Sequence, residues 1–311
     1  MQDLKVVFMG TPTFSVPILE SLINTCNVIL VVSQPDKEKD RKGAFVSTPI
    51  KQIALAHNIE VYQPTKIKEE YQKIIDTNPD IIITCAYGQI IPESLINYPR
   101  LGCINVHGSL LPRLRGGAPI HHAIINGDNE TGITIMYMDK HMDSGDIIAK
   151  RSLPIGPNDT LDVVYEKMSK LGATLLIETL PSIVAGTNDR IKQDEKYVTF
   201  GYNITKEEEK INFNNPSIKI HNLIRGLSSI PGAYCFLKEK RLKIYQSELT
   251  NTKSTSSPGT IEKIDKTGIY ISTNDNLLKI IDIKLEGKKR CLVKDFVNGI
   301  NIKDYLGKVL K

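Results

Sequence analysis

Short apolar runs rich in β-branched residues alternate with amphipathic stretches along the first 185 residues. This pattern predicts strands at residues 5–9, 27–33, 80–85, 102–107, 131–138 and 147–153. It predicts helices at residues 14–23, 49–57, 66–77, 119–126 and 160–185. Because strands that alternate with helices favour parallel pairing, we expect an α/β fold with a mainly parallel sheet. Ligands of such a sheet bind beyond the carboxyl ends of its strands.

The pattern changes near residue 200. A polar stretch at about residues 186–215 reads as a linker, and a helix is predicted at residues 218–227. Short strands with turn signals follow at residues 233–237, 242–246, 259–264, 268–273 and 277–283. Five short strands at regular spacing indicate a small antiparallel barrel of the OB type. We therefore expect one domain at residues 1–200 and a second at residues 206–311, with residues 250–257 as a loop.

Composition and cysteine spacing indicate the cellular compartment. The chain has 311 residues, of which 41% are hydrophobic and 24% are charged. The first residues lack the pattern of a signal peptide, and no apolar run approaches the ~20 residues that cross a membrane. The five cysteines are scattered and include no Cys-x-x-Cys pair. We therefore expect a cytoplasmic protein with no membrane partner and no zinc or disulfide framework.

The net charge of +5 is unevenly distributed. Residues 1–200 carry 20 Lys and Arg against 23 Asp and Glu, whereas residues 201–311 carry 20 against 12. The basic excess of +8 in the last third is what a polyanion partner such as RNA requires, and a small β-barrel often binds oligonucleotides. A solubilising lysine surface would explain the charge equally well.

Candidate chemistry lies where two of the predicted strands end. Asn105 and His107 are two residues apart, so in a strand their side chains project from the same face. Asp143 follows in a polar loop between two other predicted strands. A carboxamide, an imidazole and a carboxylate together can polarise a carbonyl, stabilise an oxyanion and move a proton. The six histidines show no metal-binding spacing, so we expect no metal site.

Two other motifs carry weaker signals. Residues 10–13 (GTPT) follow the first strand but lack the glycines of a dinucleotide fingerprint and the lysine of a P-loop. Residues 34–43 (QPDKEKDRKG) form a charged connection that is long for a compact α/β domain. A connection of this length is more often functional than idle, although it could be a solvated loop.

Taken together, these residues resemble the formyltransferase family that uses 10-formyltetrahydrofolate. In the first domain the similarity lies in residues 9–12 (MGTP), 34–36 (QPD), 86–88 (AYG), 105–112 (NVHGSLLP), 115–120 (RGGAPI), 127–128 (GD), 130–134 (ETGIT), 138–139 (MD) and 143–145 (DSG). In the second it lies in residues 204–208 (ITKEE), 220–227 (IHNLIRGL), 231–233 (PGA), 242–244 (LKI), 258–260 (PGT) and 286–290 (EGKKR). These C-terminal motifs are similar to those of members that formylate methionyl initiator tRNA.

The resemblance implies a Rossmann-like formyltransferase domain followed by an OB-like tRNA-binding domain. It implies 10-formyltetrahydrofolate as formyl donor, methionyl initiator tRNA as acceptor, no metal and a monomeric enzyme. The family pattern assigns Asn105, His107 and Asp143 as catalytic residues. In that assignment Asn105 and protonated His107 stabilise the oxyanion, and Asp143 supports the protonated histidine.

The resemblance also implies binding residues. Those expected at the folate site are Ser109, Leu110, Leu111, Pro112, Tyr87 and Gly88. Those expected to contact tRNA are Arg41, Lys42, Lys288, Lys289 and Arg290. Arg41 occupies the position of an arginine with which the family contacts the acceptor.

Two other functions compete with this interpretation. A formyltransferase that acts on a nucleotide-linked amino sugar would share the catalytic residues and would also have a second domain. A non-catalytic RNA-binding protein on the same scaffold would not need Asn105, His107 and Asp143 together. Formylation of charged initiator tRNA is the reaction that separates these three possibilities.

Overall fold

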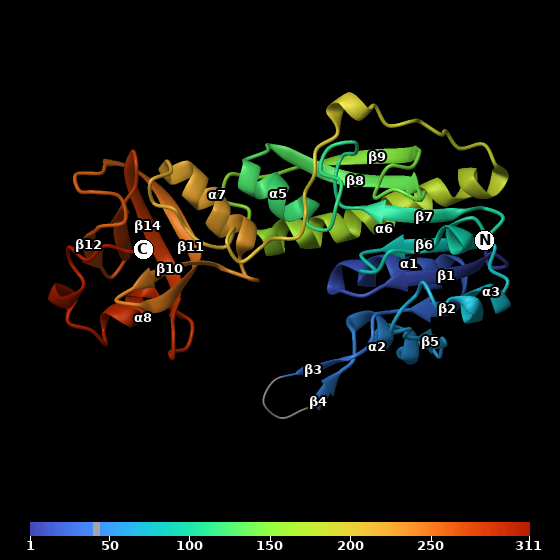
Figure 1. Ribbon diagram of the computed structural model, residues 1–311, viewed down its shortest axis with the longest axis horizontal. Helices are drawn as coiled ribbons and strands as arrows, with labels where there is room; N and C mark the ends of the chain where they lie inside the picture. The colour runs from blue at the N-terminus through green and yellow to red at the C-terminus, as the bar shows by residue number, and fades with distance from the viewer. Residues whose placement is uncertain (40–43) are drawn as a thin grey trace. The chain divides into compact units, whose positions relative to one another are not determined.

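The computed structural model describes residues 1–39 and 44–311 (Figure 1). The chain divides into two compact units. The first contains Met1–Pro119, Glu130–Pro154 and Tyr165–Tyr202, and the second contains Ile120–Asn129, Ile155–Val164 and Asn203–Lys311. The grouping of residues 120–129 and 155–164 with the C-terminal residues is not foreseen in the sequence pattern, and the division at residue 200 stays a prediction.

A seven-stranded sheet, counted over the described residues, forms the centre of the first unit, in the order β5-β2-β1-β6-β7-β8-β9. The strands are β1 (Lys5–Gly10), β2 (Asn27–Val32), β5 (Val61–Tyr62), β6 (Ile81–Cys85), β7 (Cys103–His107), β8 (Glu130–Tyr137) and β9 (Ile147–Pro154). Neighbours from β5 to β7 pair in parallel, whereas β8 and β9 join antiparallel. The mainly parallel α/β sheet predicted from the sequence is confirmed.

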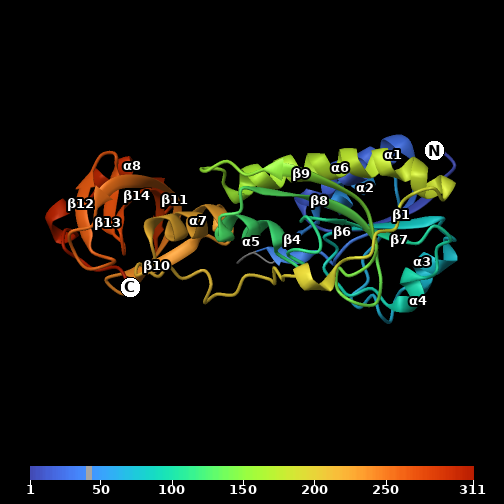
Figure 2. The ribbon, with the colours of Figure 1, turned by 90° about the horizontal axis from the view of Figure 1, so that it is seen from above.

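Helices cover both faces of this sheet. Their bounds are α1 (Val16–Thr25), α2 (Pro49–Ala56), α3 (Gln72–Asp76), α4 (Glu93–Ile96) and α6 (Leu161–Ala185), whereas nearly all of α5 (Pro119–Asn126) belongs to the second unit. Figure 2 shows α1 and α6 along one face and α3 and α4 along the other. Val7 and Met9 of β1 pack with Ile74 of α3 and Leu95 of α4, all buried. Alternate residues of the central strands therefore enter different cores, which explains their uninterrupted apolar runs.

Two predicted elements differ from the structure. The helix expected at residues 66–77 is reduced to α3, and a turn at residues 67–69 precedes it. Glu70 Oε1 accepts from the Lys66 N–H at 2.7 Å, and Gln89 Oε1 accepts from the Ile67 N–H at 2.8 Å. The charged connection contains a two-stranded ribbon of β3 (Lys37–Lys39) and β4 (Ala44–Val46).

The second unit is an antiparallel sheet with helices packed on it. Counted over the described residues, six strands pair in the order β10-β11-β14-β13-β12, with β15 on β14. The elements are α7 (Ser217–Leu227), β10 (Ala233–Leu237), β11 (Lys240–Lys253), β12 (Ile261–Asp265), β13 (Gly268–Ser272), β14 (Asn276–Leu285), β15 (Cys291–Leu292) and α8 (Val293–Val297). The small β domain predicted after the α/β domain is confirmed. The loop expected at residues 250–257 is wrong at its start, because β11 continues to Lys253, which pairs with Asn276 of β14.

The core of the second unit forms between α7 and the sheet. Ile220, Ile224 and Leu227 lie on one stripe of α7 and pack with Ile244 and Ile280 of the sheet. On the same helix, Arg225 is only 6% exposed, and its Nη1 donates to the carbonyl oxygens of Gly156 and Asp159 at 3.3 and 3.0 Å. These bonds tie residues 155–164 to the C-terminal residues. Among the described residues, no helix is long and apolar enough to span a membrane.

Candidate active site

The end of β7 positions the first two residues of the site. Asn105 and His107 lie on the same face of this strand, which is flanked by β6 in parallel and by β8 in antiparallel pairing. His107 is the last residue of the strand and is only 5% exposed. Thr84 of β6 donates from Oγ1 to Asn105 Oδ1 at 3.0 Å. This hydrogen bond orients the carboxamide so that its NH₂ group points away from Thr84 and toward Asp143.

Asp143 enters from the loop between β8 and β9. Its backbone has a positive φ of 52°, which is uncommon for a residue other than glycine. Gln193 holds that conformation, because its Nε2 donates to the carbonyl oxygens of Asp143 and Gly145 at 2.8 and 2.9 Å. The N–H of Gly116 donates to Asp143 Oδ2 at 2.8 Å. Both the backbone and the carboxylate of Asp143 are therefore fixed.

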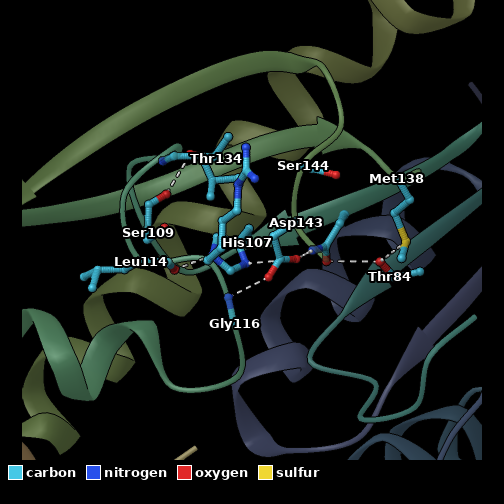
Figure 3. A network of polar contacts seen from close by, with 12 residues as sticks. Thr84, His107, Ser109, Leu114, Gly116, Thr134, Met138, Asp143 and Ser144 are labelled. Carbon is cyan, nitrogen blue, oxygen red and sulfur yellow. Dashed lines mark hydrogen bonds and ion pairs between the residues drawn. The ribbon is translucent and has the colours of Figure 1, made fainter. Parts of the chain in front are cut away.

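Asn105 and His107 both lie near one carboxylate oxygen of Asp143. Figure 3 shows the imidazole of His107 beside this carboxylate. Asp143 Oδ1 lies 3.4 Å from Asn105 Nδ2 and 3.6 Å from His107 Nδ1. On the other side of the ring, His107 Nε2 lies 3.1 Å from the carbonyl oxygen of Leu114. A carbonyl oxygen only accepts, so Nε2 carries a proton in either protonation state. Nδ1, on the opposite side of the ring, faces Asp143.

The loop at residues 108–118 follows β7 and contains the first four predicted folate residues. Ser109 Oγ donates to the Arg113 carbonyl at 2.7 Å, and the Ser109 carbonyl accepts from Thr134 Oγ1 at 2.6 Å. Ser109 and Leu111 are buried, whereas Leu110 and Pro112 are half-buried. Ser109 and Leu111 therefore stabilise the loop, and Leu110 and Pro112 are the side chains accessible to a ligand. Folate binding at this loop stays a prediction.

Tyr87 and Gly88, also predicted for folate, follow β6. The ring of Tyr87 packs in the apolar core with Val7 and Ile74, and its hydroxyl has no hydrogen-bond partner among the described residues. Burial raises the pKa of this phenol far above its usual range. The Tyr87 carbonyl accepts from Thr11 Oγ1 at 2.9 Å and from Gln34 Nε2 at 3.2 Å. The ring and the carbonyl oxygen of Tyr87 are therefore both engaged within the protein.

The sequence pattern did not predict the residues near the C-terminal end of the first unit that fix the loop at residues 108–118. Arg115 is 5% exposed and donates from Nε to Gln193 Oε1 at 3.1 Å and from Nη2 to Glu195 Oε1 at 2.8 Å. The Leu114 N–H donates to Thr199 Oγ1 at 2.9 Å. Residues 193–199 thus fix the loop that contacts His107 and Asp143. No periodicity or motif marked Gln193 or Thr199, and only the motif at residues 115–120 pointed to Arg115.

The predicted tRNA-contacting residues differ in their surroundings. Arg41 and Lys42 lie outside the described residues. Lys288 and Lys289 are exposed beside the turn after β14. Arg290 donates from Nη2 to Asp282 Oδ2 at 2.7 Å, and its guanidinium lies 4.0 Å from the Tyr245 ring centroid. The charge of Arg290 is therefore paired within the protein, whereas the two lysines project their ammonium groups into solvent.

Acidic, histidine and cysteine side chains show no grouping of three or more that could hold a metal ion, within residues 1–39 and 44–311. All five cysteines are free thiols, and four of them are buried. Burial raises the pKa of the Cys85 thiol to about 12, so this cysteine stays protonated and packs as an apolar side chain.

Comparison with known families matches both parts of the chain. Residues 4–180 match the formyl transferase family, and residues 203–301 match the formyl transferase C-terminal domain. The chain belongs to the formyl transferase family. It is therefore a formyl-transferring enzyme, and the family resemblance seen in the sequence is confirmed.

Relatives and solved structures cover nearly the whole chain. Two relatives, from Staphylococcus aureus strains MW2 and JH1, are each named methionyl-tRNA formyltransferase. Each is 48% identical over 298 residues, which is 95% of this chain and 96% of the relative. An N-formyltransferase from Helicobacter canadensis, solved with folinic acid and dTDP-3-aminofucose, is 22% identical over 90% of this chain and 98% of its own, with a TM-score of 0.67. HypX from Aquifex aeolicus, solved with tetrahydrofolic acid, is 15% identical over 96% of this chain and 47% of its own, with a TM-score of 0.64. These structures share the fold.

Proposed function

We propose that this enzyme transfers the formyl group of 10-formyltetrahydrofolate to the α-amino group of methionyl-tRNA(fMet). The product is the N-formylmethionyl initiator tRNA that begins translation. The observation that carries the proposal is the match, along 95% of the chain, to relatives named methionyl-tRNA formyltransferase. The cluster of Asn105, His107 and Asp143 supports it, because it supplies two hydrogen-bond donors and one carboxylate at a single point.

The proposed chemistry follows from this cluster. The amine attacks the formyl carbon, the new C–N bond forms and the carbonyl electrons move to oxygen. Asn105 Nδ2 and protonated His107 Nδ1 donate to this oxyanion. The hydrogen bond from Asn105 Nδ2 to Asp143 Oδ1 is long at 3.4 Å, and His107 Nδ1 lies 3.6 Å from that oxygen, beyond hydrogen-bond distance, so an incoming oxyanion can compete for both protons. When the intermediate collapses, the bond to folate N10 breaks and that nitrogen takes a proton.

Asp143 has two roles in this scheme. Its carboxylate faces His107 Nδ1 at 3.6 Å and orients the imidazole. It also collects the proton that the attacking amine releases, through water. We propose that no metal takes part, because the formyl carbon is already activated by its attachment to the folate. Since the acceptor is a tRNA used in translation, we place the reaction in the cytoplasm. The monomeric state stays a prediction.

The tRNA contacts are proposed for two places. Lys288, Lys289 and Arg290 would meet phosphates on the second unit, and Arg41 and Lys42 would meet the acceptor stem. Arginine suits this second role, since its planar guanidinium makes paired hydrogen bonds that lysine does not reproduce. Arg41→Ala should therefore impair tRNA formylation and leave formyl-folate binding unchanged. Unaltered kcat/KM for initiator tRNA in this variant would remove the arginine from the interface.

The test of the proposed function is a direct transfer assay. The purified enzyme is incubated with 10-formyltetrahydrofolate and methionyl-tRNA(fMet), and mass spectrometry of the hydrolysed ester detects formylmethionine. A parallel reaction offers a dTDP-linked amino sugar as the acceptor. We expect formylation of the tRNA only, and formylation that is about 10²–10³ times slower with Asn105→Ala. Formyl transfer to the sugar alone would favour the amino-sugar alternative. Absence of both products would favour the non-catalytic alternative.

A further inference from the structure

Two aromatic rings lie stacked on the surface of the first unit, next to the loop that contacts the catalytic cluster. The ring centroids of Phe200 and Tyr202 are 5.1 Å apart, and the ring planes differ by only 6°. The two residues are 46% and 57% exposed. The pair follows the short 3₁₀ helix at Glu195–Tyr197 and belongs to no helix or strand. It presents a flat apolar surface to solvent, of the kind on which another flat ring stacks.

Backbone hydrogen bonds attach this aromatic pair to the loop at residues 108–118. Arg115 N–H donates to the Thr199 carbonyl at 2.9 Å, and its carbonyl accepts from the Gly201 N–H at 2.7 Å. The Ala118 N–H donates to the Gly201 carbonyl at 2.9 Å. Phe200 and Tyr202 flank Gly201 on either side, so both are held by this ladder.

The attached part of the loop is the part that touches the catalytic side chains. Leu114 supplies the carbonyl that accepts from His107, and Gly116 supplies the N–H that donates to Asp143. At Gly116 the two backbones approach so closely that a Cβ there would lie 2.8 Å from the Gly201 carbonyl oxygen. The backbone at Gly116 therefore lies between Gly201 and the carboxylate of Asp143.

We propose that Phe200 and Tyr202 form a stacking site for the nucleobase at the 3′ end of the aminoacyl acceptor. The inference rests on the proposed function. In an aminoacyl-tRNA the amino acid is esterified to the ribose of the terminal adenosine, so only the ribose and the ester separate the adenine from the reacting amine. When that amine reaches His107 and Asp143, the adenine must lie on a surface beside them. Unpaired RNA bases are held in this way, on aromatic side chains.

The flat pteridine of folate is the rival occupant. The residues that we predict for folate, Ser109 to Pro112 and residues 87–88, precede Leu114 in the chain. Thr199 and Gly201, the chain neighbours of the aromatic pair, are bonded to Leu114, Arg115 and Ala118 in the later part of the loop. This division assigns the earlier part of the loop to the donor and the later part to the acceptor.

All tRNAs end in the same adenosine, so stacking on its adenine cannot distinguish one tRNA from another. The site therefore contributes affinity without distinguishing initiator from elongator tRNA. That property separates it from the proposed contacts of Arg41, whose loss should blunt this discrimination.

The first experiment compares Phe200→Leu and Tyr202→Leu with the matched variants Phe200→Tyr and Tyr202→Phe, which keep the rings. We expect each leucine variant to raise KM for methionyl-tRNA by about tenfold, from the usual strength of base–aromatic stacking. KM for 10-formyltetrahydrofolate and kcat should stay near wild type, and the aromatic variants should behave as wild type. An increase confined to the folate KM would assign the pair to the donor, and unchanged KM values would overturn the site.

A second experiment changes the 3′ nucleotide of the tRNA. Methionyl-tRNA carrying 2-aminopurine in place of the terminal adenine should lose fluorescence on binding to the wild-type enzyme, because stacking quenches this base. The fluorescence should stay high when this tRNA binds to the leucine variants. A tRNA with an abasic 3′ residue should bind wild type weakly and lose no further affinity with Phe200→Leu. Quenching that is unaffected by either leucine variant would contradict the proposal.

These readings also separate the inference from the proposed function. Wild-type enzyme that does not formylate methionyl-tRNA would contradict the function, whatever the aromatic pair does. Wild-type enzyme that formylates it while both leucine variants bind the 2-aminopurine substrate normally would contradict the stacking site alone. Melting temperatures equal to wild type would exclude unfolding as the cause of a raised KM.

Discussion

Gln193 fixes the backbone of Asp143 across 50 residues of sequence, because its side-chain amide donates to the Asp143 carbonyl at 2.8 Å. The same amide donates to Gly145, and its oxygen accepts from Arg115. One neutral side chain thereby connects the loop that carries the carboxylate with the loop that contacts the imidazole.

Gln193→Leu should lower kcat by about 10- to 100-fold, since small displacements of catalytic groups carry penalties of this size. The carboxylate of Asp143 would still be present but would lose the support of its unusual backbone conformation. Steady-state kinetics and a pH profile would measure the change. Glu195→Gln, which alters the exposed partner of Arg115, is the control and should retain activity. A Gln193→Leu enzyme with full kcat would show that Asp143 needs no such support.

Asn105→Ala, His107→Ala and Asp143→Ala should each lower turnover by about 10²–10³, the usual loss for one positioned oxyanion donor. Double variants should lose less than the product of the single losses, because the three groups act as a unit. Single-turnover assays with saturating folate would measure this, with the half-buried neighbour Ser144→Ala as control. Near-normal turnover in any one variant would remove that residue from the mechanism.

Tyr87→Phe should leave stability unchanged or raise it by about 1 kcal/mol. The Tyr87 hydroxyl is buried without a partner among the described residues, so removing it abolishes a desolvation cost. Tyr62→Phe is the contrasting variant, since it deletes a 2.7 Å hydrogen bond from its hydroxyl to the Glu70 carbonyl. Chemical denaturation would compare the free energies of unfolding. A clear loss of stability in Tyr87→Phe would mean that water or another group satisfies the hydroxyl.

Asp275→Asn should lower stability at neutral pH. Burial on its own would raise the pKa of Asp275, but hydrogen bonds from the Ser217 N–H that begins α7, from Thr273 and from the Asn276 N–H lower it to about 2. The folded pKa lies below the unfolded value of ~4, so this stabilisation is complete above ~pH 4 and is lost as the pH falls toward 2. We expect a loss of about 1–2 kcal/mol at pH 7. The difference from wild type should narrow below pH 4, whereas the exposed Asp295→Asn should show neither effect.

Lys288→Glu with Lys289→Glu should raise KM for tRNA and reduce the salt dependence of binding, because fewer counterions are released. The folate KM should not change. Lys266→Glu with Lys303→Glu makes the same charge change at two other exposed lysines. If both double variants weaken tRNA binding equally, net charge rather than a local contact is responsible. Arg290→Ala should in addition destabilise the fold, since it leaves Asp282 without its guanidinium partner.

The elements set by local pattern were predictable, and those set by distant partners were not. The buried runs at β6 and β7 have few alternatives to a central strand, and the two-residue spacing of Asn105 and His107 follows directly from such a strand. In place of the first part of the helix expected at residues 66–77 the structure has a turn, whose Ile67 N–H donates to Gln89, a partner that the local sequence does not indicate. Gln193 and Thr199 contact loops about 50 to 85 residues earlier in the chain, and local sequence contains no signal for such pairs.

Helix α6 begins in residues grouped with the C-terminal unit and continues through the first unit. The turn that precedes it depends on Arg225 for the hydrogen bonds to Gly156 and Asp159. A gene fragment ending near residue 200 would therefore delete the arginine while keeping the carbonyls that it serves. The sequence pattern suggests a domain boundary near residue 200, but the hydrogen bonds cross it. A catalytic fragment that ends there would lack the Arg225 hydrogen bonds that hold the turn before α6.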